Sequence, residues 1–256
     1  MRRALVVGGA NGIGLAIAAL MAERSEVERV YVVDKDPLIP PVTGKDVFST
    51  QGGSKIQSFL FDLLKDDYTL LDRFTDIDTL MITAGRGRME LFAELSEEEI
   101  IQTMSLNATA TMRIIKHFYH RLLSTTDDFR CGVMVSIAGY LSSPFYSVYA
   151  ASKAAQRIFI ESVNTELTKA GTTNRILNVS PGSIRGTRFN GASHTQLDLL
   201  RPLATDIISH LEAKDDLFIP QYDEVYHDVL DRYHTDFRRE GLHSYDYKLK
   251  TKDLRH

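Results

Sequence analysis

Tyr149 and Lys153 stand four residues apart, at a spacing that could support acid–base chemistry. On a helix, residues four apart share one face, so the phenol and the ammonium would be neighbours. A free phenol has a pKa of about 10, and a nearby positive charge favours its ionised form. Such a pair could exchange protons near neutral pH. Ser136, thirteen residues before Tyr149, could hold the reacting oxygen. The alternative interpretation is that Tyr149 and Lys153 are two surface residues.

The surrounding sequence predicts how these side chains are positioned. The apolar run at residues 133–135 predicts a buried strand that ends at Ser136. Gly139 and Pro144 then predict a loop. Ser147 is a suitable cap for a helix that carries the tyrosine and the lysine on one face. Strand end, loop and first helical turn would therefore meet at one place.

A second motif, the glycines Gly8, Gly12 and Gly14, stands near the start of the chain. An apolar run at residues 4–7 precedes it, and a helical pattern at 15–25 follows. Strand, glycine turn and helix in that order favour a nucleotide site, because the N-terminus of a helix attracts a pyrophosphate. The alternative is a tight turn without a ligand.

Asp34 ends the next predicted strand, residues 29–33, and follows Gly14 by twenty residues. A carboxylate there can accept hydrogen bonds from an adenosine ribose and repel a 2′-phosphate. The position before the second glycine is Asn11, which is not basic. Both observations favour NAD(H) over NADP(H), although Lys35 beside Asp34 could partly accommodate a phosphate.

The composition indicates a globular protein. Hydrophobic residues make up 43% of the 256 residues and charged residues 25%, which suits one large α/β domain with a proper core. The net charge of −4 gives no indication of a nucleic-acid surface. A single cysteine, Cys131, excludes an internal disulfide and fits a reducing compartment. No apolar run is long enough to span a membrane, and the first residues do not form a signal peptide. We therefore expect a cytoplasmic protein without a membrane partner.

Together the two motifs resemble the short-chain dehydrogenases/reductases. Tyr149-Ala150-Ala151-Ser152-Lys153 is similar to that family's YxASK, Ser136 precedes it at the family's interval, and the glycine spacing is also the family's. The resemblance covers about residues 3–190. It implies that Tyr149 exchanges the proton, Lys153 lowers the pKa of Tyr149 and holds the nicotinamide ribose, Ser136 orients the substrate oxygen, and Asn107 supports a water relay. It further implies a set of cofactor-binding residues, which is Gly8, Asn11, Gly12, Ile13, Gly14, Asp34, Asp62, Leu63, Ala84, Gly85, Tyr149, Lys153, Pro181, Gly182, Ile184 and Thr187.

The sequence departs from the family at two loops. Val7 replaces the usual threonine before the first glycine, and Ile82 replaces the first asparagine of the family's NNAG. Both changes remove hydrogen-bonding groups, which predicts weaker anchoring of these loops. The family's closing V-D-G-G segment is also absent.

The resemblance predicts an NAD(P)-dependent oxidoreductase that interconverts an alcohol and a carbonyl in a small-molecule substrate. Candidate substrate contacts are Arg86, Tyr140, Tyr146 and Arg185, which fall on loops expected to face the pocket. An epimerase or dehydratase with a tightly held cofactor remains an alternative, as does a dinucleotide sensor without turnover. No metal site is predicted: His117 and His120 lack a third ligand, and solvated histidines explain them.

We expect a Rossmann-like doubly wound parallel sheet in a single domain, residues 1–256, with a substrate-covering region and helical extension from about 190 onward. Expected strands include residues 55–61, 79–83, 176–179 and 217–219. Expected helices lie at about 68–74, 96–123, 147–170, 196–200, 202–211 and 223–240. Gly241 is expected to end the last helix, and the final fifteen residues form either a mobile tail or a docking segment.

The family resemblance also predicts a homo-oligomer, a dimer or a tetramer, in which the helices at 96–123 and 147–170 pair with a second copy. The helix expected at 223–240 has a predicted apolar face, which consists of Tyr226, Leu230, Tyr233 and Phe237. Because that face needs a partner, we expect the C-terminal region to help shape the substrate pocket.

Overall fold

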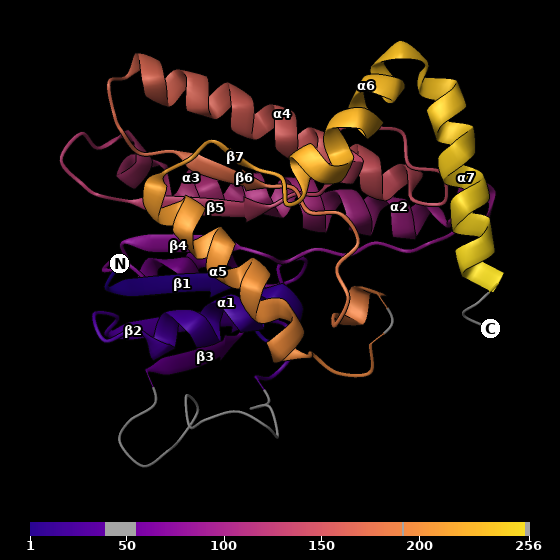
Figure 1. Cartoon of the computed structure of the whole chain (residues 1–256). Coiled ribbons are helices and arrows are strands. Elements are labelled where there is room, and N and C mark those ends of the chain that lie inside the picture. The colour runs from indigo at the N-terminus through magenta and orange to yellow at the C-terminus, as the bar shows by residue number, and fades with distance from the viewer. Residues whose placement is uncertain (39–54, 191, 254–256) are drawn as a thin grey trace.

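A single parallel sheet of seven strands forms the centre of the protein (Figure 1), and its strand order is β3-β2-β1-β4-β5-β6-β7. The computed structural model describes residues 1–38, 55–190 and 192–253. The predicted Rossmann-like doubly wound fold is confirmed. Its strands are β1 (Arg3–Val7), β2 (Arg29–Asp34), β3 (Ile56–Leu60), β4 (Thr79–Ile82), β5 (Arg130–Met134), β6 (Ile176–Val179) and β7 (Leu217–Phe218).

Helices cover both faces of the sheet (Figure 1). Helices α1 and α5 pack together on one face, and α2, α3 and α4 pack on the other. The helices are α1 (Gly12–Glu23), α2 (Glu97–Met104), α3 (Ala110–Leu123), α4 (Ser147–Lys169), α5 (Leu197–Ala213), α6 (His227–Thr235) and α7 (Phe237–Asp253). Short 3₁₀ turns are η1 (Tyr68–Arg73), η2 (Phe92–Glu94), η4 (Ile137–Gly139) and η5 (Arg188–Asn190), and π-helical turns are η3 (Ser105–Thr109) and η6 (Tyr222–Tyr226).

Strand β1 shows why the chain needs helices on both faces. Leu5 and Val7 belong to the hydrophobic cluster under α3 and α4, whereas Ala4 and Val6 belong to the cluster under α1 and α5. Successive side chains of a strand point to opposite faces, so an unbroken apolar strand must be covered twice. The strand order turns at β1, since β2 lies on one side of it and β4 on the other. In such sheets ligands bind at the carboxyl ends of the strands beside that point.

Four predicted helices differ from the structure. Residues 68–73 form a 3₁₀ turn, and Asp67 caps it by accepting a hydrogen bond from the Thr69 amide. The helix at 97–123 contains a π-helical turn, η3, between α2 and α3. The two pieces expected around Pro202 are one helix, α5, and proline lies inside it. Proline is tolerated near a helix start because the first amides have no intrahelical partner, and here it lies one turn later.

The C-terminal region also differs from its prediction. The expected helix at 223–240 is broken at Asp236, whose backbone leaves the helical region and whose carboxylate accepts hydrogen bonds from two following amides. Gly241 does not end a helix but lies within α7, which continues to Asp253. The last residues are therefore helical as far as 253, and Lys248 among them contacts Ser143, which favours the docking segment over the mobile tail. Of the predicted apolar face, Leu230 is buried, whereas Phe237 is 56% exposed.

The prolines and glycines of residues 35–54 predict mostly loop after β2, and residues 39–54 of this stretch lie outside the described residues. Within the described ranges, no helix is both long enough and apolar enough to cross a membrane.

Two of the helices that the family resemblance assigns to pairing expose apolar side chains. Ile101 on α2 is 52% exposed and Ile158 on α4 is 51% exposed, and these two helices pack against each other. Exposed aliphatic residues on adjoining helices gain free energy when a second copy covers them. We therefore propose that the protein forms a homodimer through α2 and α4.

Light scattering at micromolar concentration should give the mass of a dimer for the wild-type protein. Ile158→Glu should shift the mass toward a monomer, because it places a charge on the proposed pairing surface. Leu199→Glu is the matched control, since Leu199 is 58% exposed on α5 at the other face of the sheet. A monomeric wild-type mass would refute the proposal.

Candidate active site

The glycine turn joins β1 to α1 in a conformation that requires glycine. Gly8 has a φ of +87°, and a Cβ on it would lie 2.4 Å from the Ala84 backbone nitrogen. The turn therefore packs directly on the chain that leaves β4. The weaker anchoring predicted from Val7 and Ile82 is offset, because the Thr83 hydroxyl lies 3.1 Å from the Val7 carbonyl oxygen and 2.9 Å from that of Gly8.

The first amide of α1 faces a loop from the other half of the chain. The Gly12 N–H donates to the Thr195 hydroxyl at 2.7 Å, and the Thr187 side chain lies beside Gly12. Asn11 is the N-cap residue, with extended backbone and no side-chain capping bond. Ile13 is partly buried against the cluster under α1 and α5. The helix N-terminus that could face a pyrophosphate thus lies next to Thr187 and Thr195.

Two carboxylates, Asp34 and Asp36, lie where β2 ends. The Asp34 carboxylate accepts hydrogen bonds from the amides of Ala10 and Asp36, both at 3.0 Å. Asp36 in turn lies 3.3 Å from the Lys35 ammonium and 3.8 Å from the Arg188 guanidinium. This corner of the site is therefore acidic, and two exposed cations partly balance its negative charge.

Asp62 and Leu63 follow β3 at the same edge of the sheet. The Asp62 carboxylate accepts from the Leu64 amide at 3.0 Å, and the Leu63 carbonyl accepts from the Tyr68 hydroxyl at 3.0 Å. Leu63 is buried, and Asp62 is partly exposed. These bonds fix a short turn beside the acidic corner.

Ser136 and Tyr149 meet at the ends of β5 and α4. The Ser136 hydroxyl accepts a hydrogen bond from the Ala138 amide at 3.1 Å and lies 3.5 Å from the Pro181 carbonyl oxygen. Tyr149 is in the first turn of α4. Burial raises the pKa of Tyr149, and a hydrogen bond with Ser136 opposes that rise. The phenol is therefore protonated at neutral pH and touches the serine.

Lys153 is buried one turn farther along α4. Its ammonium donates to the Met134 carbonyl and to the Gln156 side-chain oxygen, both at 2.8 Å, and lies 5.6 Å from the centre of the Tyr149 ring. Burial lowers the pKa of Lys153 to about 7. The resemblance implies that Lys153 lowers the pKa of Tyr149; in this structure burial has the largest effect on the pKa of Tyr149 and raises it.

Asn107 lies in the π-helical turn η3 and is fully buried. Its amide oxygen accepts from the Arg86 backbone N–H at 2.9 Å, and its amide nitrogen donates to the Arg86 carbonyl and the Ser152 hydroxyl, both at 2.8 Å. A Cβ on Gly85 would lie 3.3 Å from the Asn107 side-chain oxygen and 3.5 Å from the Lys153 nitrogen. Asn107 thus fixes the chain after β4 within reach of Lys153.

The loop from Pro181 to Thr187 closes the site from β6. The Pro181 carbonyl accepts from the Ile137 amide at 3.0 Å, and the Thr187 hydroxyl donates to the Ile184 carbonyl at 3.2 Å. Gly182 lies directly against the Tyr226 hydroxyl, which occupies the place where a Cβ would be. Part of the C-terminal region therefore rests on this loop.

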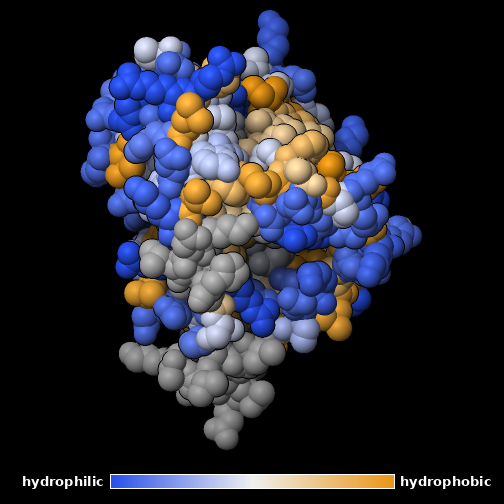
Figure 2. Space-filling model, turned by 90° about the vertical axis from the view of Figure 1, so that its right-hand side faces the viewer, coloured by the Kyte–Doolittle hydropathy of each residue, from blue (hydrophilic) through white to orange (hydrophobic). Residues whose placement is uncertain are grey.

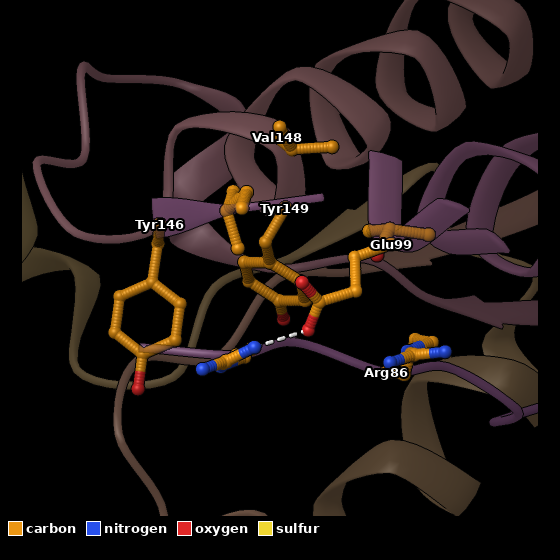
Figure 3. Close-up of a pocket in the computed structure, with 8 residues that line it drawn as sticks. Arg86, Glu99, Tyr146, Val148 and Tyr149 are labelled. Atoms are coloured by element: carbon orange, nitrogen blue, oxygen red, sulfur yellow. Dashed lines mark hydrogen bonds and ion pairs between the residues drawn. The ribbon is translucent and has the colours of Figure 1, made fainter. Parts of the chain in front are cut away.

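A small pocket opens at Tyr149 (Figure 3). The rings of Tyr146 and Tyr149 lie next to each other, and Glu99 and Arg86 lie on the opposite side from Tyr146. Glu99 forms an ion pair with Arg88, and its pKa is lowered to about 2, chiefly by the Ser96 amide and then by Arg88. The lining residues are Arg86, Arg88, Leu95, Glu99, Thr103, Tyr146, Val148 and Tyr149.

Of the four predicted substrate contacts, Arg86 and Tyr146 line this pocket. Tyr140 lies elsewhere: its hydroxyl accepts from the Asn178 side chain at 2.8 Å, and its ring packs near Leu230. Arg185 is exposed and does not belong to the lining.

Phe189 is a site residue that sequence reasoning missed. Its ring centre lies 5.4 Å from that of Tyr149 and 6.3 Å from that of Tyr146, so it covers the tyrosine from the loop after β6. The only feature of the sequence that could have indicated this role is that Phe189 is an isolated phenylalanine in a polar loop. Among the described residues, no group of three or more His, Cys, Asp or Glu side chains is placed to hold a metal ion.

Comparison with known proteins agrees with this geometry. A sequence model of the family described as short chain dehydrogenase matches residues 2–198. The chain belongs to the short-chain dehydrogenase family. Within this family, the 3-oxoacyl-acyl-carrier-protein reductase FabG of Chlamydia muridarum is 28% identical over 205 residues, covering 75% of this chain and 77% of the relative. The uncharacterized oxidoreductase YhxD of Bacillus subtilis is 28% identical over 193 residues, covering 72% of this chain and 61% of the relative.

Solved structures of short-chain dehydrogenases share the fold. One is the alcohol dehydrogenase from the archaeon Thermococcus sibiricus, complexed with 5-hydroxy-NADP, with a TM-score of 0.67, 20% identity and coverage of 86% of this chain and 95% of that one. Another is a short chain dehydrogenase from Burkholderia cenocepacia in complex with NADP, with a TM-score of 0.70, 20% identity and coverage of 91% and 98%.

The buried Lys153 predicts a pH-dependent stability. Its pKa falls from 10.5 to about 7 on folding, so the unfolded chain binds the extra proton between these values, and wild-type stability should rise with pH there. Lys153→Met removes this dependence. In urea unfolding, the variant's stability relative to wild type should therefore be more favourable at about pH 6.5 than at about pH 10.

Lys169→Met is the control for that measurement, because Lys169 is exposed at the last turn of the same helix. It should give the same difference from wild type at both pH values. A pH-independent difference for Lys153→Met would contradict the assignment of a buried amine whose pKa is lowered by burial.

Proposed function

We propose that the protein is an NAD(P)-dependent oxidoreductase that interconverts an alcohol and a carbonyl by hydride transfer. The single observation that carries this proposal is the position of Tyr149, which lines a pocket, contacts Ser136 and lies one helical turn from the buried Lys153. A phenol in this setting can exchange a proton with a substrate oxygen. A bound nicotinamide cofactor would supply or accept the hydride.

Each polar group has a separate part in the proposed reaction. Tyr149, whose pKa is raised by burial, holds its proton at neutral pH and is set to donate it to a carbonyl oxygen. Ser136 orients that oxygen through its hydroxyl. Lys153 lies behind the tyrosine, and Asn107 holds the chain after β4.

The substrate side of the proposed site is the pocket beside Tyr149. Arg86 donates to the neutral side chain of Gln102, and Tyr146 forms the opposite wall. The substrate is a small molecule that brings its carbonyl between Ser136 and Tyr149. The reductase name of the FabG relative and the alcohol dehydrogenase name of a structural neighbour both belong to this reaction class.

We propose NAD(H) as the preferred cofactor. Asp34 and Asp36 stand together at the end of β2, where the adenosine ribose would lie, and a 2′-phosphate there would face two carboxylates. Two structural neighbours were solved with NADP or its hydroxy derivative, and at 20% identity they share the fold with this chain. Lys35 and Arg188 are the cations that could offset the repulsion, but both lie next to Asp36.

Tyr149→Phe tests the chemistry. It removes the proton donor and keeps the ring, so turnover of a carbonyl substrate should fall at least about 100-fold while NADH binding changes little. Tyr119→Phe is the control: it removes a hydroxyl on α3 that lies 3.3 Å from Glu166, which is near the end of α4 opposite to Tyr149, and turnover should be unchanged. Turnover near the wild-type value in Tyr149→Phe would disprove the proposed mechanism.

Fluorescence titration tests the cofactor preference. Repulsion between the 2′-phosphate and the carboxylates amounts to about 1–4 kcal/mol at close range, so NADH should bind at least about fivefold more tightly than NADPH. Asp36→Asn should reduce the difference in affinity between NADH and NADPH, because it removes one carboxylate and frees Arg188 and Lys35 to contact the phosphate. Equal or tighter binding of NADPH to the wild-type protein would overturn the preference.

A further inference from the structure

The C-terminal helix α7 packs on the loop that joins the two catalytic positions, Ser136 and Tyr149. Within this loop, the Phe145 ring lies 4.7 Å from the ring of Tyr245 on α7. The Lys248 ammonium, also on α7, donates to the Ser143 hydroxyl at 2.6 Å and to the Pro144 carbonyl at 3.1 Å. The family match ends at residue 198, so α7 lies beyond it.

The contacted loop has a backbone that needs support. Phe145 has a φ of +66°, in the left-handed region that a bulky side chain rarely occupies. Such a conformation persists only when its surroundings hold it. Phe145 is buried, its carbonyl accepts from the Glu90 amide at 2.8 Å, and Tyr245 packs on its ring. Helix α7 and the segment at Glu90 therefore hold Phe145 in place by contacts on two sides.

Tyr146 connects the supported residue Phe145 to the pocket. It follows Phe145 directly, is the N-cap residue of α4, and lines the pocket with its ring 5.8 Å from that of Tyr149. The Lys248 ammonium lies 5.5 Å from the centre of the Tyr146 ring. A cation over an aromatic face attracts it, so Lys248 contacts both the loop and the pocket wall.

The charged group of Lys248 lies in an unusual, half-buried environment. Burial lowers its pKa to about 8. Among the described residues no carboxylate forms an ion pair with it, and its partners are a hydroxyl, a carbonyl and an aromatic ring. A half-buried ammonium costs free energy unless its hydrogen bonds compensate, so its contacts hold it in one position.

The rest of α7 contributes little apolar burial. Phe237, Leu242 and Tyr247 are 56%, 61% and 67% exposed. Figure 2 shows the side of the molecule that lies on the right in Figure 1, where some hydrophobic residues gather toward the upper right of the view and others lie singly among hydrophilic ones. Tyr245 and Lys248 therefore hold the helix on the catalytic loop, together with Gly241, which packs against the Ser142 side chain.

We propose that Lys248 is a positioning residue that fixes Tyr146 as the wall of the substrate pocket, so that the C-terminal extension sets the affinity for the carbonyl substrate. This inference rests on the proposed function, because it assigns Lys248 to the same site. It acts through Ser143, Pro144 and Tyr146, and it leaves the dinucleotide end at β1 and β2 unchanged.

Lys248→Met tests the inference in the full-length protein. The variant should lower kcat/KM for a carbonyl substrate about tenfold, mainly through KM, while the Kd for NADH stays within about twofold. Lys250→Met is the matched control, since Lys250 is exposed on the same helix, and it should leave all constants unchanged. Lys248→Arg keeps the charge and the donors and should restore most of the loss.

Ser143→Ala completes a double-mutant cycle. If Lys248 acts through this hydroxyl, the double variant Ser143→Ala/Lys248→Met should be no worse than Lys248→Met alone. Additive losses would show that the two residues act separately and would overturn the proposed route. Unchanged KM in Lys248→Met would overturn the proposal as a whole.

Hydrogen exchange of residues 142–149 gives a readout that needs no turnover. Exchange should be faster in Lys248→Met and Ser143→Ala than in wild type and in Lys250→Met. If the wild-type protein reduces no carbonyl compound, the proposed function fails, and exchange still decides whether Lys248 holds the loop. Unchanged exchange in both variants would refute the positioning role.

Discussion

The burial of Lys153 is the constraint on which the active-site arrangement depends. An amine in this position must give its hydrogen bonds to protein oxygens, and it gives them to Met134 at the end of β5 and to Gln156 on α4. Gln156 donates to Thr111, and Thr111 donates to the Asn107 carbonyl. A continuous chain of bonds thus joins the sheet, α4 and the π-helical turn. A buried network of this kind specifies one arrangement, because a missing partner would leave a desolvated polar group.

The same network explains why Asn107 needs an irregular helix. Its side chain bonds the backbone of Arg86 and the hydroxyl of Ser152, and Ser152 donates to the Tyr149 carbonyl at 2.6 Å. In a regular helix, successive residues turn by a fixed angle, so one residue cannot be redirected alone. In the π-helical turn each hydrogen bond spans one residue more than in an α-helix, and this changes the direction of the side chain at that point. The catalytic helix, the turn and the chain after β4 are therefore positioned together.

The sheet was predictable from the sequence because its central strands contain or border short apolar runs, as at residues 4–7 and 133–135. The residues near the pocket were also predictable in part, since Ser136 and Tyr149 carry a family spacing. The π-helical turn was not, because the residues around Asn107 fit a regular helical pattern equally well. The same limit applies to α7, where Gly241 suggested a stop: Asp236 caps the new helix five residues earlier, and tertiary contacts through Lys248 hold it. The contact of Phe189 with Tyr149 depends on loop geometry that no local pattern encodes.

The most direct test of the proposed chemistry follows the hydride itself. The protein would be incubated with NADH deuterated at its hydride-donating carbon and with a panel of aldehydes and ketones, including acidic ones, and the alcohols would be analysed by mass spectrometry. We predict that wild-type protein places deuterium on the former carbonyl carbon of at least one substrate, and that Tyr149→Phe does so at least about 100-fold more slowly. Oxidation of NADH without deuterium in any alcohol, or equal labelling by the two proteins, would contradict the account.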